Sequence, residues 1–378
     1  MKVLLVATVK SHIVQFHRPL VSMLHEHGAE VYAAAYDNLA VKNGLKLDFV
    51  DGVYDIPFVR SPFSPKNIAA YRALKKVIDG GGFDVIHCNT PVGGIVGRLA
   101  ARKAKKGGTK VLYTAHGFHF FKGGPKKSWL IYYPVEKLMA RLTDRLITIN
   151  EEDNRLAEEK FNTEVCRIHG VGVDTERYHE ADGETRASLR AAEGLTDGDF
   201  AILCTGELNE NKNQTTLLEA AAKLKKSLPN LKVLLAGNGP LEGRLRERAA
   251  SLGLEDTVRF LGYRTDLERV TPAVDIVVSC SRREGLPLNI VEAMLCGRAV
   301  VASENRGHRE LVKDGKTGYI LSPDDAEGFA GAILRLANDK ELRTRLGAEG
   351  KKFAQSYTVP NVKKELEEIY FADSEVKK

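Results

Sequence analysis

Apolar runs of strand length alternate with segments of helix length along almost the whole chain, and this alternation constrains the fold strongly. The runs are continuously apolar, which is typical of parallel strands covered by helices on both faces. We therefore predict an α/β fold built on parallel sheets. In the first half the predicted strands are KVLLVAT (2–8), EVYAAAY (30–36), DVIHCN (84–89), KVLYTAHG (110–117) and RLITIN (145–150).

A polar stretch, HEADGETRASLRAAEGLTDGD (179–199), interrupts the pattern, and the alternation then restarts. Because 378 residues exceed the usual size of one core, we predict two facing, doubly wound, Rossmann-like domains with a linker near 175–199. Their ligands are expected in a cleft between them, beyond the carboxyl ends of the strands. The predicted domains are 1–175 and 176–358, and the segment 359–378 is expected to be a C-terminal helix that packs back on the first domain. The later predicted strands are FAILCTGEL (200–208), LKVLLAGNG (231–239), VRFLG (258–262), DIVVSCS (275–281) and RAVVAS (298–303), followed by a helical tail after about residue 325.

Charge is distributed unevenly between the two halves. Residues 1–175 contain 25 Lys and Arg against 17 Asp and Glu, and no acidic residue lies between Asp84 and Glu136. A basic first half indicates an anionic partner, which could be nucleic acid, phospholipid or a phosphorylated substrate.

The first residues, MKVLLVATVK, are expected to form a buried strand and not a signal peptide. No apolar run approaches the roughly 20 residues that cross a bilayer. The five cysteines include no CxxC pair, which favours buried free thiols in a reducing cytoplasm.

The stretch SRREGLPLNIVEAMLCGRAVV (281–301) follows a predicted strand and places Glu284 and Glu292 eight positions apart. Pro287 suits the first turn of a helix that ends at Gly297, and Leu286 at the N-cap supplies no side-chain acceptor. The amides of Leu286, Leu288 and Asn289 would then form a phosphate site at the positive end of the helix dipole. Glu284 and Glu292 would flank this site and accept from sugar or ribose hydroxyls. The alternative is that they are an ordinary turn residue and an ordinary surface residue.

This segment resembles the retaining family 4 glycosyltransferases of the GT-B fold, whose signature is E-x7-E in the setting S-x-x-E-G-L-P-…-E-A-M-…-G-…-V-V-A-S. Here the sequence reads SRREGLPLNIVEAMLCGRAVVAS (281–303), followed by ELVKDGKTGYIL (310–321). The resemblance implies that Glu284 contacts the hydroxyls of the donor sugar and that Glu292 holds the ribose of the nucleotide. It also implies that the backbone after Gly285, through Leu286, Pro287, Leu288 and Asn289, contacts the sugar and phosphate.

The segment GELNENKNQ (206–214) begins with Gly206 and contains Lys212, which could pair with the donor diphosphate. Family members commonly carry an arginine shortly after the first glycine, but this chain has Glu207. We therefore expect Lys212 to act alone, or with Arg282 or Arg283.

Two further loops are assigned to the donor by the resemblance. AGNGP (236–240) resembles the family's G-x-G-P turn, so Asn238 and Gly239 are candidates, although a purely structural turn explains it equally well. FLGYRTDL (260–267) matches the region that packs on the base in the family, which points to Tyr263 and Arg264.

In the first domain, His116 in TAHGFHFF (114–121) matches the family histidine that faces the donor sugar, although a histidine at the end of a strand is more often structural. His119 has no such support. The loop TVKSH (8–12) lacks the glycine pair common in the family, and His12 is assigned to the acceptor side.

FHFFKGGPKKSWLIYYP (118–134) mixes aromatic residues with lysines. Base stacking on nucleic acid is conceivable, but Trp129 with Lys122, Lys126 and Lys127 fits an anionic membrane surface better. The alternative is an ordinary amphipathic helix packed on its own domain.

Together these features predict a retaining, metal-independent glycosyltransferase that takes a nucleotide-diphosphate sugar, UDP by default, as substrate and needs no cofactor. His116, Lys212 and Glu284 are the predicted catalytic residues. The expected acceptor is a polyprenyl-diphosphate-linked or other glycan at the inner face of the cytoplasmic membrane, and nucleic acid is not an expected partner. The alternatives are a sugar-nucleotide epimerase or hydrolase on the same fold, and a non-catalytic nucleotide-sugar binder.

Overall fold

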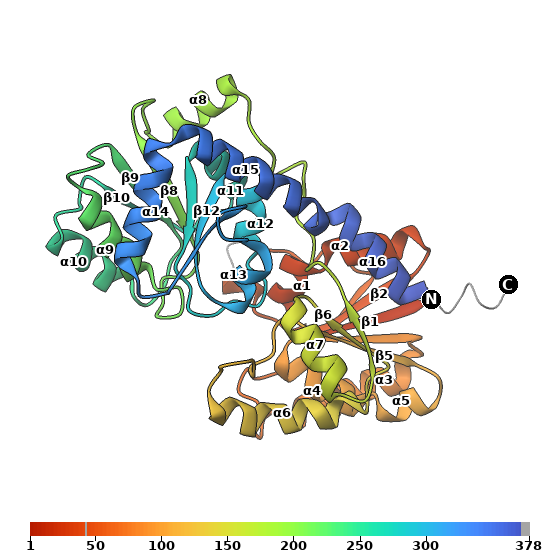
Figure 1. The fold of residues 1–378 in the computed structure, drawn as a ribbon. Coiled ribbons are helices and arrows are strands. Elements are labelled where there is room, and N and C mark those ends of the chain that lie inside the picture. The colour runs from red at the N-terminus through yellow and green to blue at the C-terminus, as the bar shows by residue number, and fades with distance from the viewer. Residues whose placement is uncertain (42–43, 372–378) are drawn as a thin grey trace. The chain divides into compact units, whose positions relative to one another are not determined.

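The structure is a computed structural model that describes residues 1–41 and 44–371. The chain forms two compact units, and in the described residues unit 1 comprises 1–172 with 359–371 and unit 2 comprises 173–358. The boundaries expected from the sequence were 175/176 and 358/359. Each unit is a parallel sheet with helices on both faces (Figure 1).

Unit 1 contains a seven-stranded parallel sheet in the order β3-β2-β1-β4-β5-β6-β7. All five strands predicted in this half are present, whereas β3 and β7 were not predicted. Both are four-residue edge strands without a continuously buried run. The strands are β1 (Lys2–Val9), β2 (Glu30–Tyr36), β3 (Gly52–Asp55), β4 (Val85–Asn89), β5 (Lys110–Ala115), β6 (Arg145–Thr148) and β7 (Glu164–Arg167). The helices are α1 (Lys10–Phe16), α2 (Arg18–Glu26), α3 (Asn67–Gly81), α4 (Pro91–Ala100), α5 (Arg102–Lys106), α6 (Lys126–Ala140), α7 (Glu151–Lys160) and α16 (Val359–Phe371), with a 3₁₀ turn at Leu39–Val41.

Unit 2 contains a six-stranded parallel sheet in the order β10-β9-β8-β11-β12-β13. The central strands are buried on both faces, as their apolar runs predict. The strands are β8 (Phe200–Thr205), β9 (Leu231–Ala236), β10 (Val258–Gly262), β11 (Ile276–Ser279), β12 (Ala299–Ser303) and β13 (Gly318–Leu321). The helices are α8 (Gly183–Ala192), α9 (Gln214–Leu224), α10 (Glu242–Ser251), α11 (Leu267–Val270), α12 (Leu288–Leu295), α13 (Arg306–Leu311), α14 (Ala326–Asn338) and α15 (Lys340–Ala354), with 3₁₀ turns at Thr271–Ala273 and Gln355–Tyr357.

The segment expected to be a linker, 175–199, is an ordered part of unit 2. It contains α8, and the buried Arg190 fixes this helix to the sheet. Its guanidinium donates to the carbonyls of Ala273, Thr196 and Asp199 at 2.7–3.0 Å. The linker prediction is therefore wrong, because one buried arginine, and no apolar stripe, anchors the helix.

Helix α16 belongs to unit 1, where it lies along α2 (Figure 1). Lys363 pairs with Glu26 at 2.6 Å, and the Tyr370 hydroxyl lies 2.6 Å from Nδ1 of His87. The rest of the predicted 359–378 helix, residues 372–378, lies outside the described residues.

Among the described residues, no helix is both long enough and apolar enough to span a membrane. All five cysteines are free thiols, and Cys88, Cys204, Cys280 and Cys296 are buried, as their positions in apolar runs predict.

Candidate active site

The donor residues predicted from the sequence follow the carboxyl ends of the unit 2 strands. The order of the sheet reverses between β8 and β11, which end at Thr205 and Ser279. In open α/β sheets, ligands bind at such a switch point, beyond the carboxyl ends of the strands. The predicted residues in the loops at this edge are Gly206, Lys212, Asn238, Gly239, Tyr263, Arg264 and Glu284.

Lys212 and Glu284 form an ion pair at this switch point. The Lys212 Nζ lies 2.7 Å from Glu284 Oε1, and both side chains are largely shielded from solvent. Two further bonds join their loops: the Arg282 amide donates to the Asn211 carbonyl (2.7 Å), and Asn211 Nδ2 donates to the Arg283 carbonyl (3.0 Å). The predicted cation and the predicted sugar-binding carboxylate are thus held together.

Helix α12 begins one residue later than predicted. Pro287 was expected in the first turn with Leu286 at the N-cap, but Pro287 itself occupies the N-cap because its ψ of 102° is extended. The helix begins at Leu288 and ends, as predicted, before Gly297, which has a φ of +69°. Proline, like leucine, offers no side-chain acceptor, so the helix start has no side-chain cap.

The start of α12 is suited to an anion. The amides of Leu288 and Asn289 have no intrahelical acceptor, because they lie in the first turn. The Asn289 side chain donates to Thr205 Oγ1 at 3.0 Å and so ties the helix start to the end of β8. The helix dipole favours negative charge at this end, next to the loop that carries Glu284 and Gly285.

Glu292 lies on α12, where burial raises the pKa of its carboxyl to about 7. The Arg177 guanidinium and the Tyr178 hydroxyl oppose this rise but do not overcome it. Near neutral pH the carboxyl therefore exists in both protonation states, and either state can hydrogen-bond a hydroxyl group.

The glycines of the β8 and β9 loops permit close approach of two backbones. A Cβ on Gly237 would lie 2.0 Å from the Gly206 carbonyl oxygen, and a Cβ on Gly239 would lie 2.3 Å from that of Leu208. Gly237 also has a φ of +149°. This packing accounts for the G-x-G-P turn, and Asn238, between the two glycines, has an exposed polar side chain available to a ligand.

The two residues expected near the base have different surroundings. The Arg264 guanidinium is held by two carboxylates, Glu193 at 2.8 Å and Asp266 at 2.7 Å. Tyr263 is 49% exposed. Tyr263 is therefore the more accessible side chain of this loop.

The cations beside the glutamate loop also differ. Arg282 forms a two-pronged pair with Asp324, at 2.8 and 2.5 Å. Arg283 is exposed, and within 1–41 and 44–371 its guanidinium has no hydrogen bond or ion pair. Glu207, which stands where the family commonly has arginine, is exposed and accepts a bond from Asn209.

Sequence reasoning missed the support that helix α13, which follows β12, gives to Glu284. A Cβ on Gly307 would lie 2.9 Å from the Cβ of Glu284, so only glycine allows this packing. The next residue, His308, is buried, and its Nδ1 lies 2.6 Å from the Ser303 carbonyl oxygen and its Nε2 3.1 Å from Ser279 Oγ. Burial lowers the pKa of His308 to about 4, so it stays neutral. The signal was SENRGHREL, a glycine and a histidine directly after a buried strand.

In unit 1, His116 follows β5 at the carboxyl edge of the sheet. Its Nε2 lies 3.2 Å from Nε2 of His12, on α1, and 3.1 Å from Oδ1 of Asn89. Burial, together with a smaller effect of the nearby His17, lowers the pKa of His116 to about 3, so the ring is neutral. His116 and His12, predicted separately, thus lie in contact.

A cavity of about 250 Å³ lies beside His116 within unit 1. Glu136 lines it and accepts from Arg98 at 2.8 Å and from the Tyr113 hydroxyl at 3.2 Å. Arg98 is 1% exposed, and its guanidinium lies 3.7 Å from the centre of the Tyr113 ring. The cavity is otherwise mainly apolar, with Phe63, Ile95, Phe120, Ile131 and Val135 among its lining residues.

Helix α6 carries the aromatic and basic residues that were expected to meet a membrane. Trp129 is partly buried: its Nε1 donates to the Phe121 carbonyl (3.0 Å) and its ring packs on Phe120. The indole therefore packs in part against the unit's own core, and its contact with a membrane stays a prediction. The large exposed apolar residues of α6 are Leu130 (78%), Leu138 (56%) and Val135 (37%). The exposed lysines of this segment are Lys122, Lys126, Lys127 and Lys137.

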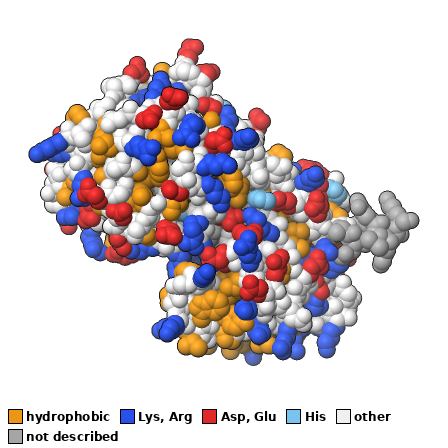
Figure 2. Space-filling model, in the orientation of Figure 1, with side chains coloured by type: hydrophobic (Ala, Val, Ile, Leu, Met, Phe, Trp, Pro, Cys, Tyr) orange, Lys and Arg blue, Asp and Glu red, His pale blue; other side chains and the backbone are white. Residues whose placement is uncertain are grey.

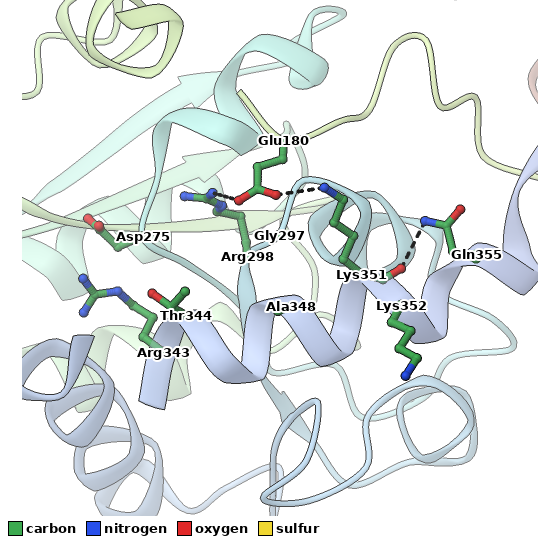
Figure 3. Close-up of a pocket in the computed structure, with 10 residues that line it drawn as sticks. All are labelled: Glu180, Asp275, Gly297, Arg298, Arg343, Thr344, Ala348, Lys351, Lys352 and Gln355. Atoms are coloured by element: carbon green, nitrogen blue, oxygen red, sulfur yellow. Dashed lines mark hydrogen bonds and ion pairs between the residues drawn. The ribbon is translucent and has the colours of Figure 1, made fainter. Parts of the chain in front are cut away.

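A second cavity, of about 440 Å³, lies in unit 2 but contains none of the predicted residues (Figure 3). It is lined by Asp275 and Arg298, which directly precede β11 and β12. It therefore lies at the amino edge of the sheet, opposite the switch point. Two of its lining residues form an ion pair, with Lys351 Nζ 2.8 Å from Glu180 Oε2 (Figure 3).

Comparison with known proteins gives a consistent result across the chain. The family described as "Glycosyl transferases group 1" matches residues 185–353, and "Glycosyltransferase Family 4" matches residues 9–177. The chain is 44% identical to "Putative glycosyltransferase EpsD" of Bacillus subtilis, covering 98% of this chain and 96% of that protein. It is 30% identical to "UDP-Gal:alpha-D-GlcNAc-diphosphoundecaprenol alpha-1,3-galactosyltransferase" of Escherichia coli, covering 73% of this chain and 70% of that protein.

Solved structures show the same fold. Anabaena Alr3699/HepE, determined in complex with UDP and glucose, matches with a TM-score of 0.81 at 22% identity, over 98% of this chain and 100% of that chain. Sucrose-phosphate synthase from Thermosynechococcus elongatus matches with a TM-score of 0.81 at 19% identity, over the whole of both chains.

Proposed function

The chain belongs to the group 1, family 4 type of glycosyltransferases and has the GT-B fold, and on this premise we propose that it is a retaining enzyme. Its donor is a UDP-sugar, and its acceptor is a glycan linked to polyprenyl diphosphate. The reaction breaks the bond between the anomeric carbon and the diphosphate. An acceptor hydroxyl forms the new bond on the same face of the sugar and loses its proton.

The Lys212–Glu284 pair beside the start of α12 carries this proposal. A diphosphate at the helix start offers Lys212 a more highly charged partner than one carboxylate. Lys212 then leaves Glu284, whose oxygens become free to accept from sugar hydroxyls. The two residues that are paired before binding thus have separate roles afterwards: Lys212 contacts the phosphate and Glu284 contacts the sugar.

Stabilisation of the leaving diphosphate needs positive charge at a fixed position. Lys212 and the first-turn amides of α12 provide it without a metal ion. Arg283, exposed and unpaired among the described residues, is the second cation in place of the family's arginine, since Arg282 is held by Asp324. Glu292 binds the ribose, and neutral His116 contacts the sugar from unit 1.

For the acceptor, the Escherichia coli relative is named for a diphosphoundecaprenol-linked substrate. The basic surface of unit 1 suits a diphosphate, and the largely apolar cavity beside His116 suits the first part of a lipid chain. These two features of one unit support a lipid-linked acceptor.

The exposed face of α6 supports docking on an anionic membrane. Leu130 and Leu138 are exposed among Lys127 and Lys137, while the helix's one acidic residue, Glu136, is buried. Figure 2 shows hydrophobic side chains gathered on the lower part of unit 1, where α6 lies, with Lys and Arg around them. Apolar residues bordered by lysines favour the interface of an anionic bilayer, which would place the enzyme on the inner face of the cytoplasmic membrane.

The test is to incubate the protein with a panel of sugar nucleotides, with and without a polyprenyl-diphosphate-linked acceptor, and to measure nucleoside diphosphate release. We expect release from one UDP-sugar that depends on the acceptor. Nucleoside diphosphate release without acceptor would instead indicate a hydrolase, and formation of a new sugar nucleotide would indicate an epimerase. Binding of a sugar nucleotide without turnover would indicate a non-catalytic binder.

A further inference from the structure

Three histidines of unit 1 converge at the carboxyl edge of its sheet. His12 lies on α1, His17 joins α1 to α2, and His116 follows β5. One ring nitrogen from each lies within 4.8 Å of the other two. We propose that these three side chains bind a divalent transition-metal ion of the zinc type, and that the bound ion inhibits sugar transfer.

The spacing of the rings suits such an ion. The Nε2 atoms of His12 and His116 are 3.2 Å apart. Two nitrogens bound tetrahedrally to zinc at 2.0–2.1 Å are separated by about 3.3 Å. These two ligands therefore already have the separation that zinc requires, and His17 completes a three-histidine set with a small movement. A fourth position stays open for water or a substrate atom.

His17 is the most informative member of the group. It is 4% exposed, and among the described residues its Nδ1 has no hydrogen-bond partner. Buried polar atoms normally have one. His87, buried in the same unit, offers the contrast, because its Nδ1 lies 2.6 Å from the Tyr370 hydroxyl and its Nε2 lies 2.7 Å from Thr114 Oγ1. Both ring nitrogens of His87 have hydrogen-bond partners, as in a structural histidine. The ring of His17 interacts with Asn89 and the His12 backbone, but its Nδ1 lacks the partner that a metal ion would supply.

The protonation state also suits a metal. Burial lowers the pKa of His12, His17 and His116 below the usual histidine value, so all three are neutral at pH 7 and have lone pairs to offer. His12 and His116 are partly exposed, so an ion can reach the group. Imidazole ligands select zinc, cobalt, nickel and copper over magnesium and calcium.

The inhibitory effect rests on the proposed function, in which His116 contacts the donor sugar. A metal ion on Nε2 of His116 occupies the atom now facing His12 and Asn89. Transfer is therefore expected to need no metal, to slow when zinc is added, and to recover when a chelator removes it.

Binding is tested without activity by titrating chelator-treated, full-length protein with Co²⁺ and recording visible absorption. We expect one equivalent of Co²⁺ to give the intense bands of a tetrahedral site. His12→Ala and His17→Ala should weaken Co²⁺ binding by at least tenfold, whereas His119→Ala, an exposed histidine outside the group, should leave it unchanged. Circular dichroism confirms that each variant is folded. Absence of the bands in the wild type, or equal binding in all variants, overturns the site.

A second arm measures the effect of Zn²⁺ on nucleoside diphosphate release. Zinc should inhibit the wild type and His119→Ala at the same concentration, and His17→Ala only at a concentration at least tenfold higher. If Co²⁺ binds but zinc leaves release unchanged, the inhibitory effect is refuted while the metal site stands. If no variant or condition gives release, the proposed function fails independently of the Co²⁺ result.

Discussion

Lys212 and Glu284 form an ion pair in the absence of donor, so removing either residue leaves the other without its ion-pair partner. Lys212→Ala removes the cation that pairs with the largely shielded Glu284 carboxylate. In the proposed function it also removes a positive charge from beside the leaving diphosphate. Glu284→Gln keeps the shape and frees Lys212 from its ion pair. The two variants therefore separate the phosphate contact from the sugar contact.

We predict that Lys212→Ala lowers the turnover of nucleoside diphosphate release by roughly 10²-fold or more. Glu284→Gln should lower turnover while UDP affinity is kept or increased, because the freed lysine meets the diphosphate without competition. UDP affinity by calorimetry and release kinetics measure the two effects. Arg283→Ala should weaken UDP binding more than Arg282→Ala; the reverse order would contradict the assignment of Arg283 as the second cation.

Glu292 gives a prediction on pH. The folded-state pKa of its carboxyl is raised from 4.5 to about 7. Between these values the folded protein holds a proton that the unfolded chain has lost, so this group's contribution to stability falls as pH rises through that window. Relative to Glu292→Gln, the free energy of unfolding of the wild type should fall by on the order of 1–3 kcal/mol from acid to alkaline pH. Urea unfolding across the range measures this, and a difference independent of pH would contradict it.

At the scale of elements, α4 and α6 are joined by the buried pair of Arg98 and Glu136. Removing one partner of a buried pair commonly costs about 3–5 kcal/mol, because the other charge stays buried. We predict that Arg98→Met destabilises unit 1 by that amount, and that adding Glu136→Leu recovers part of it. Trp129, the chain's one tryptophan, lies on α6, so its fluorescence reports the unfolding of unit 1. Equal stability of Arg98→Met and wild type would refute the prediction.

Helix α6 also carries the membrane prediction. The double variant Leu130→Gln with Leu138→Gln should bind less well to phosphatidylglycerol-containing vesicles. Neutralising Lys127 and Lys137 should weaken the free energy of vesicle binding by roughly 1 kcal/mol per charge. Val41→Gln makes the same kind of change at an exposed residue outside α6 and serves as the control. Vesicle co-sedimentation at two salt concentrations measures the effect. Binding that is equal in all variants would contradict docking through α6.

The elements also show what the sequence could predict. Buried central strands were identified because their apolar runs are continuous. The strands β3, β7 and β13 were not predicted, because each has only four residues and lies, incompletely buried, at the edge of a sheet. Helix α8 was read as a linker because its anchor is one buried arginine. Trp129 was expected at a membrane because its residue type fits an interface as well as a core. Only packing distinguishes these cases.

For the site residues, too, the contacts depend on packing that the sequence does not show. Lys212 and Glu284 were predicted as separate contacts with a donor, and the structure brings them together because β8 and β11 are adjacent strands. Gly307 packs against Glu284 and His308 joins the ends of β11 and β12. Both were missed because a motif of donor contacts does not contain such supporting residues. The contact between His12 and His116 likewise depends on sheet order, which places β1 and β5 on either side of β4.

For the whole molecule, chemistry is divided between two units that the chain crosses twice, at 172/173 and 358/359. In the proposed function, unit 2 supplies the diphosphate contacts, whereas unit 1 carries His116, the apolar cavity and the exposed face of α6. We therefore expect turnover to require the full-length protein.

The central claim is retaining transfer from a UDP-sugar, and the anomeric configuration of the product tests it most directly. Full-length protein is incubated with an α-linked UDP-sugar and a polyprenyl-diphosphate-linked glycan, and the new glycosidic bond is examined by NMR. We predict an α-linked product, formed by the wild type and strongly reduced in Lys212→Ala. A β-linked product, or UDP released at the same rate without acceptor, would contradict the account.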